Sequence, residues 1–197
     1  GIKVFDIRTE KIVYQALRTA NPGDQNNCSE IISMGQGRYW VGTQKGIVEF
    51  RRSGSTYQVV DVQIPGLDLS KSTIPSLMLD HKGAEVWFAA NGKGLYVYHL
   101  ASRTWKMMTN TNDIRLDKCR FDRIMQDQNG VVWIGTDTYG MLSYDLGKNK
   151  FGLYSKGATK NVGLGFYSTW GGYIDNEQNL WIGNADAGQN TVGYINR

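Results

Sequence analysis

The sequence is poor in proline, cysteine and histidine. Of its 197 residues, 3 are Pro, 2 are Cys and 2 are His. The cysteines, Cys28 and Cys119, are too few for a disulfide scaffold and lack metal-ligand spacing, so we expect two small buried side chains rather than a bridge. His81 and His99 form no metal-binding pair, and the chain has no nucleophile elbow, phosphate-cradling loop or aligned acid pair. We therefore predict no catalytic residues, no cofactor and no metal, and we expect that the chain is not an enzyme.

Long apolar runs and blocks of like charge are also lacking. No run approaches the roughly 18 apolar residues of a membrane span, and the start of the chain shows no signal-peptide pattern. We expect a chain that is soluble as given, without direct membrane insertion, although a segment of an exported or anchored protein would look the same. The formal net charge of +4 comes from scattered residues. It argues against nucleic acid as a partner, since neither a basic stripe nor a stacking platform is evident.

Glycine and aromatic residues are abundant by contrast. The chain has 24 Gly, 11 Tyr, 6 Trp and 6 Phe, a balance that suits tight turns and aromatic-rich strands. One five-residue sequence motif occurs four times, as Tyr39–Thr43, Val86–Ala90, Val132–Thr136 and Leu180–Asn184. Its tryptophans, at positions 40, 87, 133 and 181, follow one another at intervals of 47, 46 and 48 residues. Such a constant period in such a distinctive element indicates a solenoid or a propeller.

The residues around each tryptophan predict four short strands. In the third repeat, an alternating segment over 121–126 leads through a turn into the Trp133 strand, and two further strands follow at 141–145 and 151–154. Four strands joined by hairpin turns make one antiparallel propeller blade, and no long window of helical period competes with this. A single blade cannot bury both of its faces, so the blades must stack. We predict an all-β fold in which the four tryptophans pack between blades.

The repeats divide the chain into a single, partial propeller domain over residues 1–197. We place the repeats at approximately 1–27 (partial), 28–73, 74–117, 118–165 and 166–197 (partial), with 17 strands in all. A seven-bladed propeller of this repeat size would need about 330 residues, so the chain would be part of a larger propeller. A closed four-bladed ring is the alternative. An open segment would expose blade edges and should associate with another copy of itself.

The third repeat resembles a known family. Residues Asp127–Thr136 followed by Gly140–Asp145 are similar to the two component regulator propeller repeat, which has an Asp-x-x-Gly turn, Leu-Trp-Ile-Gly-Thr, and then Gly-Gly-Leu-x-x-Tyr-Asp. Residues 118–154 match best, residues 28–50 and 74–100 match more loosely, and residues 166–197 lose the regular third strand. The resemblance implies the periplasmic sensor region of a hybrid two component system, ahead of a membrane span and a histidine kinase. It thus implies a periplasmic or extracellular location and oligosaccharides as ligands.

A ligand site is expected on one face of the blades. The turns between second and third strands, together with the connections between blades, collect on that face, where rigid strands position variable loops. Its amides, charges and aromatic rings suit a small polar ligand such as a sugar. The candidate ligand-binding residues are Lys45, Asn91, Lys93, Asp113, Arg115, Asp137, Tyr139, Tyr167 and Asp186.

Three other interpretations compete with ligand sensing. A protein-interaction propeller would use exposed aromatics on outer strands, namely Tyr57, Trp105 and Tyr154. Propeller lyases share the tryptophan turn, but they resemble this chain less because their repeat is shorter and they depend on a histidine near the channel. The oxygen-rich segment Asp175–Asn179 could hold calcium, although a plain hairpin turn explains it better.

Overall fold

The computed structural model describes residues 1–16, 27–109, 114–155, 168–186 and 189–195. Within these ranges the chain forms strands and one 3-10 turn, η1 (Leu116–Lys118), and no helix is long and apolar enough to cross a membrane. The strands are β1 (Ile2–Asp6), β2 (Lys11–Ala16), β3 (Cys28–Gly35), β4 (Arg38–Thr43), β5 (Gly46–Ser53), β6 (Thr56–Asp61), β7 (Leu77–Leu79), β8 (Glu85–Ala90), β9 (Gly94–His99), β10 (Thr104–Met107), β11 (Phe121–Gln126), β12 (Val131–Thr136), β13 (Met141–Asp145), β14 (Lys150–Tyr154), β15 (Thr169–Ile174), β16 (Leu180–Asp186) and β17 (Gln189–Ile195).

These strands form five antiparallel sheets in chain order. Three sheets have four strands each (β3–β6, β7–β10 and β11–β14), while the first has β1 and β2 and the last has β15–β17. Every strand pairs only with its neighbours in sequence, as hairpin turns dictate. The predicted all-β class and blade architecture are confirmed.

One predicted strand is shorter than expected. The alternation predicts a strand over 74–79, but β7 covers only Leu77–Leu79. Pro75 has no N–H to donate to a ladder, and the N–H of Ile74 donates to the carbonyl of Thr43 in the preceding sheet at 2.9 Å. The start of this segment therefore bonds to the preceding sheet before it enters its own.

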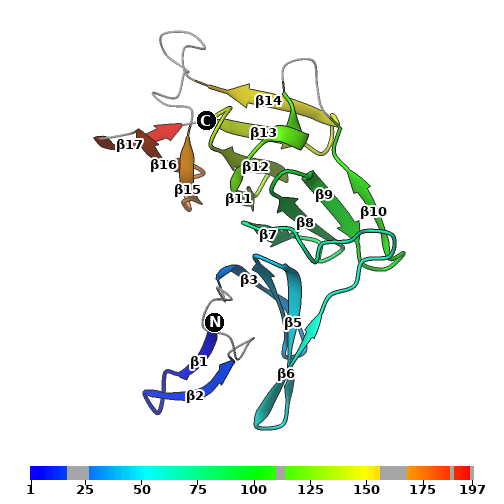
Figure 1. The fold of residues 1–197 in the computed structure, drawn as a ribbon. Helices are drawn as coiled ribbons and strands as arrows, with labels where there is room; N and C mark the ends of the chain where they lie inside the picture. Colours follow the sequence, from blue (N-terminus) through cyan, green and yellow to red (C-terminus); the bar gives the residue numbers. More distant parts are fainter. Residues whose placement is uncertain (17–26, 110–113, 156–167, 187–188, 196–197) are drawn as a thin grey trace.

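The sheets are arranged in an open arc (Figure 1). The first strands of successive sheets, β3, β7, β11 and β15, contact one another on the concave side, and the fourth strands lie on the outside. The β1–β2 sheet and the β15–β17 sheet stand at the two ends of the arc and do not pair. The described residues therefore form a run of blades and not the closed four-bladed ring.

A polar chain of contacts joins the inner strands. The Glu30 carboxylate of β3 accepts hydrogen bonds from the Ser76 hydroxyl at 2.5 Å and from the Leu77 N–H at 3.3 Å. Its other oxygen lies 3.0 Å from the guanidinium of Arg123 in β11. One mostly buried acid thus ties three consecutive blades together near the axis.

Apolar side chains between the sheets form the core. Trp40, Trp87 and Trp133 are 7%, 0% and 2% exposed, which confirms the prediction that they pack between blades. Trp133 lies against Leu180 and Ile182 of the next sheet. Burial of each such large side chain contributes about 1.5–3 kcal/mol. Trp181 is 44% exposed, since no described sheet follows to cover it.

The glycine two residues after the tryptophan marks where the next blade approaches. A Cβ on Gly42 would lie 2.7 Å from the carbonyl oxygen of Ile74, and one on Gly135 would lie 2.7 Å from the Thr169 hydroxyl. A Cβ on Gly183 would find its nearest neighbour at 3.8 Å, within its own sheet. In the first and third of these repeats glycine stands there because the inner strand of the next blade occupies the space of a side chain, whereas the second repeat accommodates the buried Ala89 at this position.

Candidate functional site

The short turns and the longer connections do share one face, which we call the loop face. The Lys93 ammonium of the β8–β9 turn donates to the backbone carbonyl of Asp68, in the connection between β6 and β7, at 2.6 Å. The hydroxyl of Tyr139, in the β12–β13 turn, accepts the N–H of Arg115, in the next connection, at 3.3 Å. The predicted site residues that the structure describes fall into two groups on this face.

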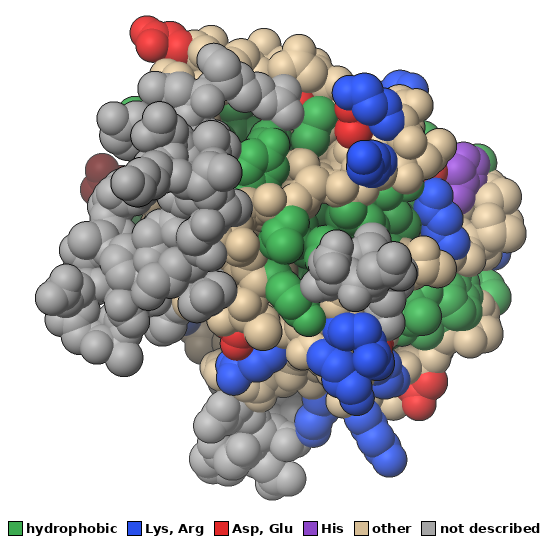
Figure 2. Space-filling view, turned by 90° about the horizontal axis from the view of Figure 1, so that it is seen from above, with side chains coloured by type: hydrophobic (Ala, Val, Ile, Leu, Met, Phe, Trp, Pro, Cys, Tyr) green, Lys and Arg blue, Asp and Glu red, His purple; other side chains and the backbone are tan. Residues whose placement is uncertain are grey.

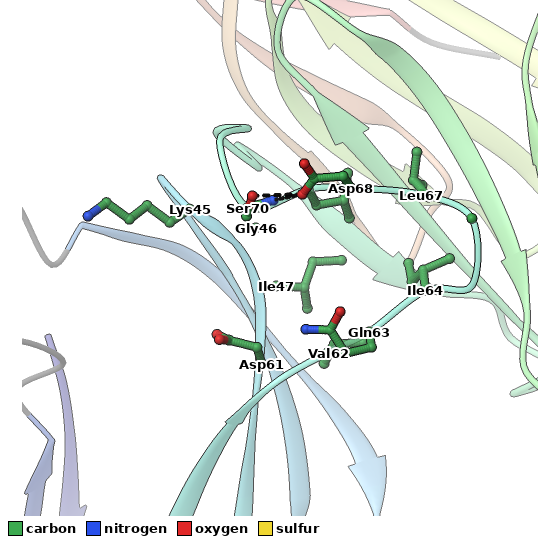
Figure 3. Close-up of a pocket in the computed structure, with 12 residues that line it drawn as sticks. Lys45, Gly46, Ile47, Asp61, Val62, Gln63, Ile64, Leu67, Asp68 and Ser70 are labelled. Atoms are coloured by element: carbon green, nitrogen blue, oxygen red, sulfur yellow. Dashed lines mark hydrogen bonds between the residues drawn. The ribbon is translucent and has the colours of Figure 1, made fainter.

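The first group consists of Lys45, Asn91 and Lys93, of which Lys45 lines a cavity of about 670 Å³ (Figure 3). It lies between the β4–β5 turn and the connection that runs from β6 toward β7. Its lining consists of Lys45, Gly46, Ile47, Asp61, Val62, Gln63, Ile64, Gly66, Leu67, Asp68, Leu69 and Ser70. The volume is within the range of small-ligand sites.

The cavity combines an apolar floor with a polar rim. Ile47, Ile64 and Leu69 are 2%, 5% and 6% exposed and anchor the connection. The rim carries amide, acid, hydroxyl and ammonium groups, which can donate to and accept from the hydroxyls of a ligand. No aromatic ring is among the lining residues, so a stacking platform for a sugar is not part of this cavity.

Asp68 and Ser70 hold the rim in shape. Oδ1 of Asp68 accepts the Ser70 hydroxyl at 2.7 Å and the Ser70 N–H at 2.9 Å, as the dashed lines in Figure 3 show. These two hydrogen bonds, with the charges of Lys93 and Lys71, hold the pKa of Asp68 below its ordinary value. Asp68 is therefore ionised at neutral pH. Lys45 extends from the opposite side of the cavity into solvent.

Asn91 and Lys93, from the same prediction, are engaged in structural contacts. The side-chain oxygen of Asn91 accepts the N–H of Phe121 at 3.1 Å and so fixes the start of β11. Lys93 uses its ammonium on the Asp68 carbonyl. Lys93 therefore stands beside the cavity and steadies its rim.

The second group gathers around the β12–β13 turn. The guanidinium of Arg115 pairs with both carboxylate oxygens of Asp117 at 3.0 and 2.9 Å. The carboxylate of Asp137 accepts from Thr138 at 2.8 Å and lies 3.3 Å from Arg120. Tyr139 packs against the core beneath. These residues hold one another in place rather than facing an open cavity.

Two ionisable groups lie below this second group, the half-buried Asp122 and the buried Cys119. Burial raises the pKa of Asp122 to about 6, the charge of Asp137 adds to the rise, and Arg120 opposes it. Its Oδ2 is buried without a hydrogen-bond partner among the described residues. Burial, helped by Asp137 and Asp117, also raises the pKa of Cys119 to about 12. Cys119 is therefore a protonated, unreactive thiol.

Several sequence predictions lie outside the described structure. Asp113 and Tyr167 fall in undescribed segments, and Asp186 ends β16 with its side chain undescribed. Cys119 is buried as predicted, but Cys28 is only half-buried, and both are free thiols.

The three outer-strand aromatics are not the exposed surface that an interaction propeller would use. Tyr57 packs on Tyr14 with ring centroids 4.9 Å apart, and Tyr154 packs on Trp133 at 5.5 Å. The Trp105 indole donates to the Pro65 carbonyl at 2.8 Å. All three are partly buried. Their expected full exposure is therefore not found, because Tyr57 packs on a neighbouring sheet, Trp105 bonds to the preceding connection and Tyr154 packs on the tryptophan of its own sheet.

The Asp175–Asn179 segment is a hairpin turn. Oδ1 of Asp175 accepts the N–H groups of Glu177 and Asn179 at 3.0 and 2.8 Å, and its Oδ2 accepts the indole N–H of Trp181 at 2.8 Å. Both oxygens are thus used within the turn. Across the described ranges, no three His, Cys, Asp or Glu side chains are grouped so as to hold a metal ion.

Comparison with known proteins is consistent with this architecture. A model of the two component regulator propeller matches residues 116–138, which run from η1 through β12. Residues 116–138 therefore match one two component regulator propeller repeat. No curated protein matches it in sequence.

Several solved structures with a similar fold are extracellular or surface proteins of bacteria. The extracellular domain assigned to a hybrid two component system of B. thetaiotaomicron is 24% identical, with a TM-score of 0.67 over 93% of this propeller segment and 22% of that chain. The extracellular domain assigned to a one component system of the same organism is 19% identical, with a TM-score of 0.71 over 92% and 23%. PorZ, a surface component of the type-IX secretion system of Porphyromonas gingivalis, is 17% identical, with a TM-score of 0.66 over 90% and 27%.

The chain therefore spans about a quarter of the length of these structures. At such identities the similarity concerns the fold. In fold, the segment resembles extracellular domains of two component systems.

Proposed function

We propose that this segment belongs to the periplasmic or extracellular sensor region of a two component regulator and binds a small polar ligand without catalysing a reaction. An oligosaccharide is the ligand class that best suits the polar rim of the loop-face cavity. The repeat family and the similar extracellular domains support the sensor role. Neither the two cysteines nor the two histidines line the cavity, and the Cys119 thiol is protonated.

The cavity beside Lys45 carries the proposal. It is the place on the loop face where acid, amide, hydroxyl and ammonium groups converge over a buried apolar floor. The Lys93 bond to Asp68 fixes the connection on one side, so the rim is organised before a ligand arrives. Such a rim can bind several sugar hydroxyls at once.

Calorimetric titration of the chain with a panel of neutral oligosaccharides tests this proposal. Joint replacement of Lys45→Ala and Asp68→Ala removes the two charged groups of the rim and should weaken binding by roughly tenfold or more. Lys82→Ala, in the exposed β7–β8 turn on the opposite face, is the control and should leave binding unchanged. Thermal melts show whether the double variant is folded. A folded double variant that binds as well as the parent chain would overturn this choice of site.

We also propose that the segment associates through its blade ends. Trp181 and Tyr173 of the last sheet are 44% and 64% exposed, and no described sheet lies against them. At the other end, β1 and β2 pack against the outer strands β5 and β6, and Ile31 of the inner strand β3 is 54% exposed. The β15–β17 sheet thus presents its inner strands at one end of the arc, whereas the β1–β2 sheet at the other end lacks inner strands.

A further inference from the structure

A second cleft, between the β3–β6 and β7–β10 sheets, brings three arginines together. It encloses about 470 Å³, and the arginines that line it are Arg38, Arg51 and Arg103. Arg38 and Arg51 are partners in the β4–β5 ladder, so they stand side by side on one face of their sheet. Arg103 comes from the β9–β10 turn of the next sheet. The cleft is therefore assembled from both blades.

A buried carboxylate orients two of these arginines. The side chain of Glu49 is only 7% exposed, and its Oε1 accepts from Nε and Nη2 of Arg51 at 3.0 and 2.6 Å. Its Oε2 accepts the indole N–H of Trp40 at 2.9 Å and lies 3.7 Å from Arg38. Burial alone would raise the pKa of Glu49, but the bonds from Trp40 and Arg51 and the two guanidinium charges outweigh it and lower the pKa. Glu49 is therefore ionised and fixed.

The blade does not need this arrangement for its own packing. The residues paired with the tryptophan in the next two sheets are Val97 and Ser143, opposite Trp87 and Trp133. Among the described four-stranded sheets, only the first has an acidic residue opposite its tryptophan. The acid adds charge to the cleft and holds two cations at its edge.

The third arginine occupies an unusual backbone position. Arg103 has a φ of 57°, in the left-handed region where Gly54 and Asn149 stand at the corresponding turns of the neighbouring sheets. Its side chain is exposed and makes no hydrogen bond or ion pair with any residue in the described part of the chain. Three guanidinium groups face two carboxylates, Glu49 and Asp61, around the cleft, so its charge is positive.

The floor beneath the arginines is apolar. Trp40 and Tyr98 stack with ring centroids 6.1 Å apart at 28°, and Leu100 and Val62 extend the surface. A planar guanidinium fork matches a carboxylate in two parallel hydrogen bonds. We propose that this cleft binds a small organic acid, with its carboxylate on the arginine rim and its carbon skeleton on the floor. The site is distinct from the loop-face cavity and does not depend on the oligosaccharide proposal.

D-glucuronate and D-glucose are suitable probes because they share a ring and differ in the carboxylate. Calorimetric titration of the full chain should show glucuronate binding roughly tenfold or more tighter than glucose, and binding should weaken as salt is added. Equal affinity for the two sugars would overturn the proposal. Inorganic sulfate should compete poorly; if sulfate displaces glucuronate at equal concentration, the site takes any oxyanion and the assignment to carboxylates is wrong.

Arg103→Asn is the decisive variant. Asparagine tolerates the left-handed position, so the melting temperature should be retained or raised, while glucuronate binding should fall by roughly tenfold or more. Arg52→Gln is the matched control, since Arg52 is the next residue to Arg51 in β5 and its side chain points to the other side of the sheet. Unchanged binding in Arg103→Asn, or an equal loss in Arg52→Gln, would overturn the site. Lys45→Ala with Asp68→Ala should leave glucuronate binding intact, which separates this cleft from the loop-face cavity.

Figure 2 shows that basic side chains gather in separate groups on the face that it displays, divided by apolar and uncharged surface. A single stripe along which an acidic polymer could lie is not seen on that face. A compact site for one small anion is consistent with such a distribution.

Discussion

Asp80 stands seven residues before Trp87, and its carboxylate does not satisfy the indole. Oδ1 of Asp80 accepts the N–H groups of Ala84 and Glu85 at 2.7 and 2.8 Å, while the Trp87 indole N–H is buried with no hydrogen-bond partner among the described residues. In the third repeat the spacing is six, and the Trp133 indole donates to Oδ2 of Asp127 at 3.0 Å. The second repeat has one extra residue after Gly83. Its aspartate therefore does not bind the buried indole N–H, as the aspartate of the third repeat does.

Replacing each of these tryptophans by phenylalanine should have unequal effects. Trp133→Phe removes the indole bond and leaves Oδ2 of Asp127 buried without it, whereas Trp87→Phe removes a donor that has no partner. Both variants lose similar ring volume, so the first should cost about 1–3 kcal/mol more in the free energy of unfolding. Urea unfolding measures the difference. Equal losses would show that the hydrogen bond contributes little.

Gly42→Ala and Gly183→Ala test the close approach between blades. A Cβ at Gly42 meets the Ile74 carbonyl at 2.7 Å, so the inner strand of the next blade must shift, and a loss of about 1–3 kcal/mol is expected. The same change at Gly183 meets no atom closer than 3.8 Å and should be nearly neutral in this chain. Thermal melts of the two variants distinguish them. A large loss at Gly183 would mean that another surface covers it.

The repeat pattern of the sequence was enough to predict the blades. A tryptophan every 46 to 48 residues and the turns around it predict strands such as Phe121–Gln126 and Met141–Asp145, both of which the structure confirms. Local alternation and hairpin chemistry determine these strands, and both are readable along the chain.

The candidate sites could be predicted only in part. Lys45 was expected on the loop face and borders its cavity, but Lys93 and Asp137 belong to separate groups of contacts. The partnership of Glu49 with Trp40 depends on strand register, and that of Arg103 with the first complete sheet depends on how two blades pack. Neither relation is contained in a local pattern.

Asp122 should make stability depend on pH in an uncommon direction. Its pKa of about 6 in the folded chain lies above the ordinary value of 3.8, so ionisation opposes folding. The contribution of this group to the free energy of unfolding should therefore fall as pH rises from about 4 to 6. Because Asp122 is only half-buried, solvent screening reduces this effect, and Asp122→Asn should raise stability by about 1 kcal/mol at pH 7.5 and by little at pH 4.

Asp145→Asn is the contrasting variant for that measurement. Hydrogen bonds from the Lys148 side chain and from backbone N–H groups lower the pKa of Asp145, so its replacement should bring no gain at pH 7.5. Chemical unfolding at the two pH values compares the variants. A gain for Asp122→Asn that is the same at pH 4 and pH 7.5 would contradict the account of a half-buried, ionised acid.

The most direct test of the open arc is the mass of the 197-residue chain in solution, measured by light scattering over a range of concentrations. The exposed Trp181 face and the missing inner strands beside β1 and β2 predict a mass that rises above 22.1 kDa with concentration. Trp181→Lys, which places a charge on the uncovered face, should return the chain to 22.1 kDa. A parent chain that stays at 22.1 kDa at every concentration, with a cooperative melt, would contradict the account and indicate a closed ring.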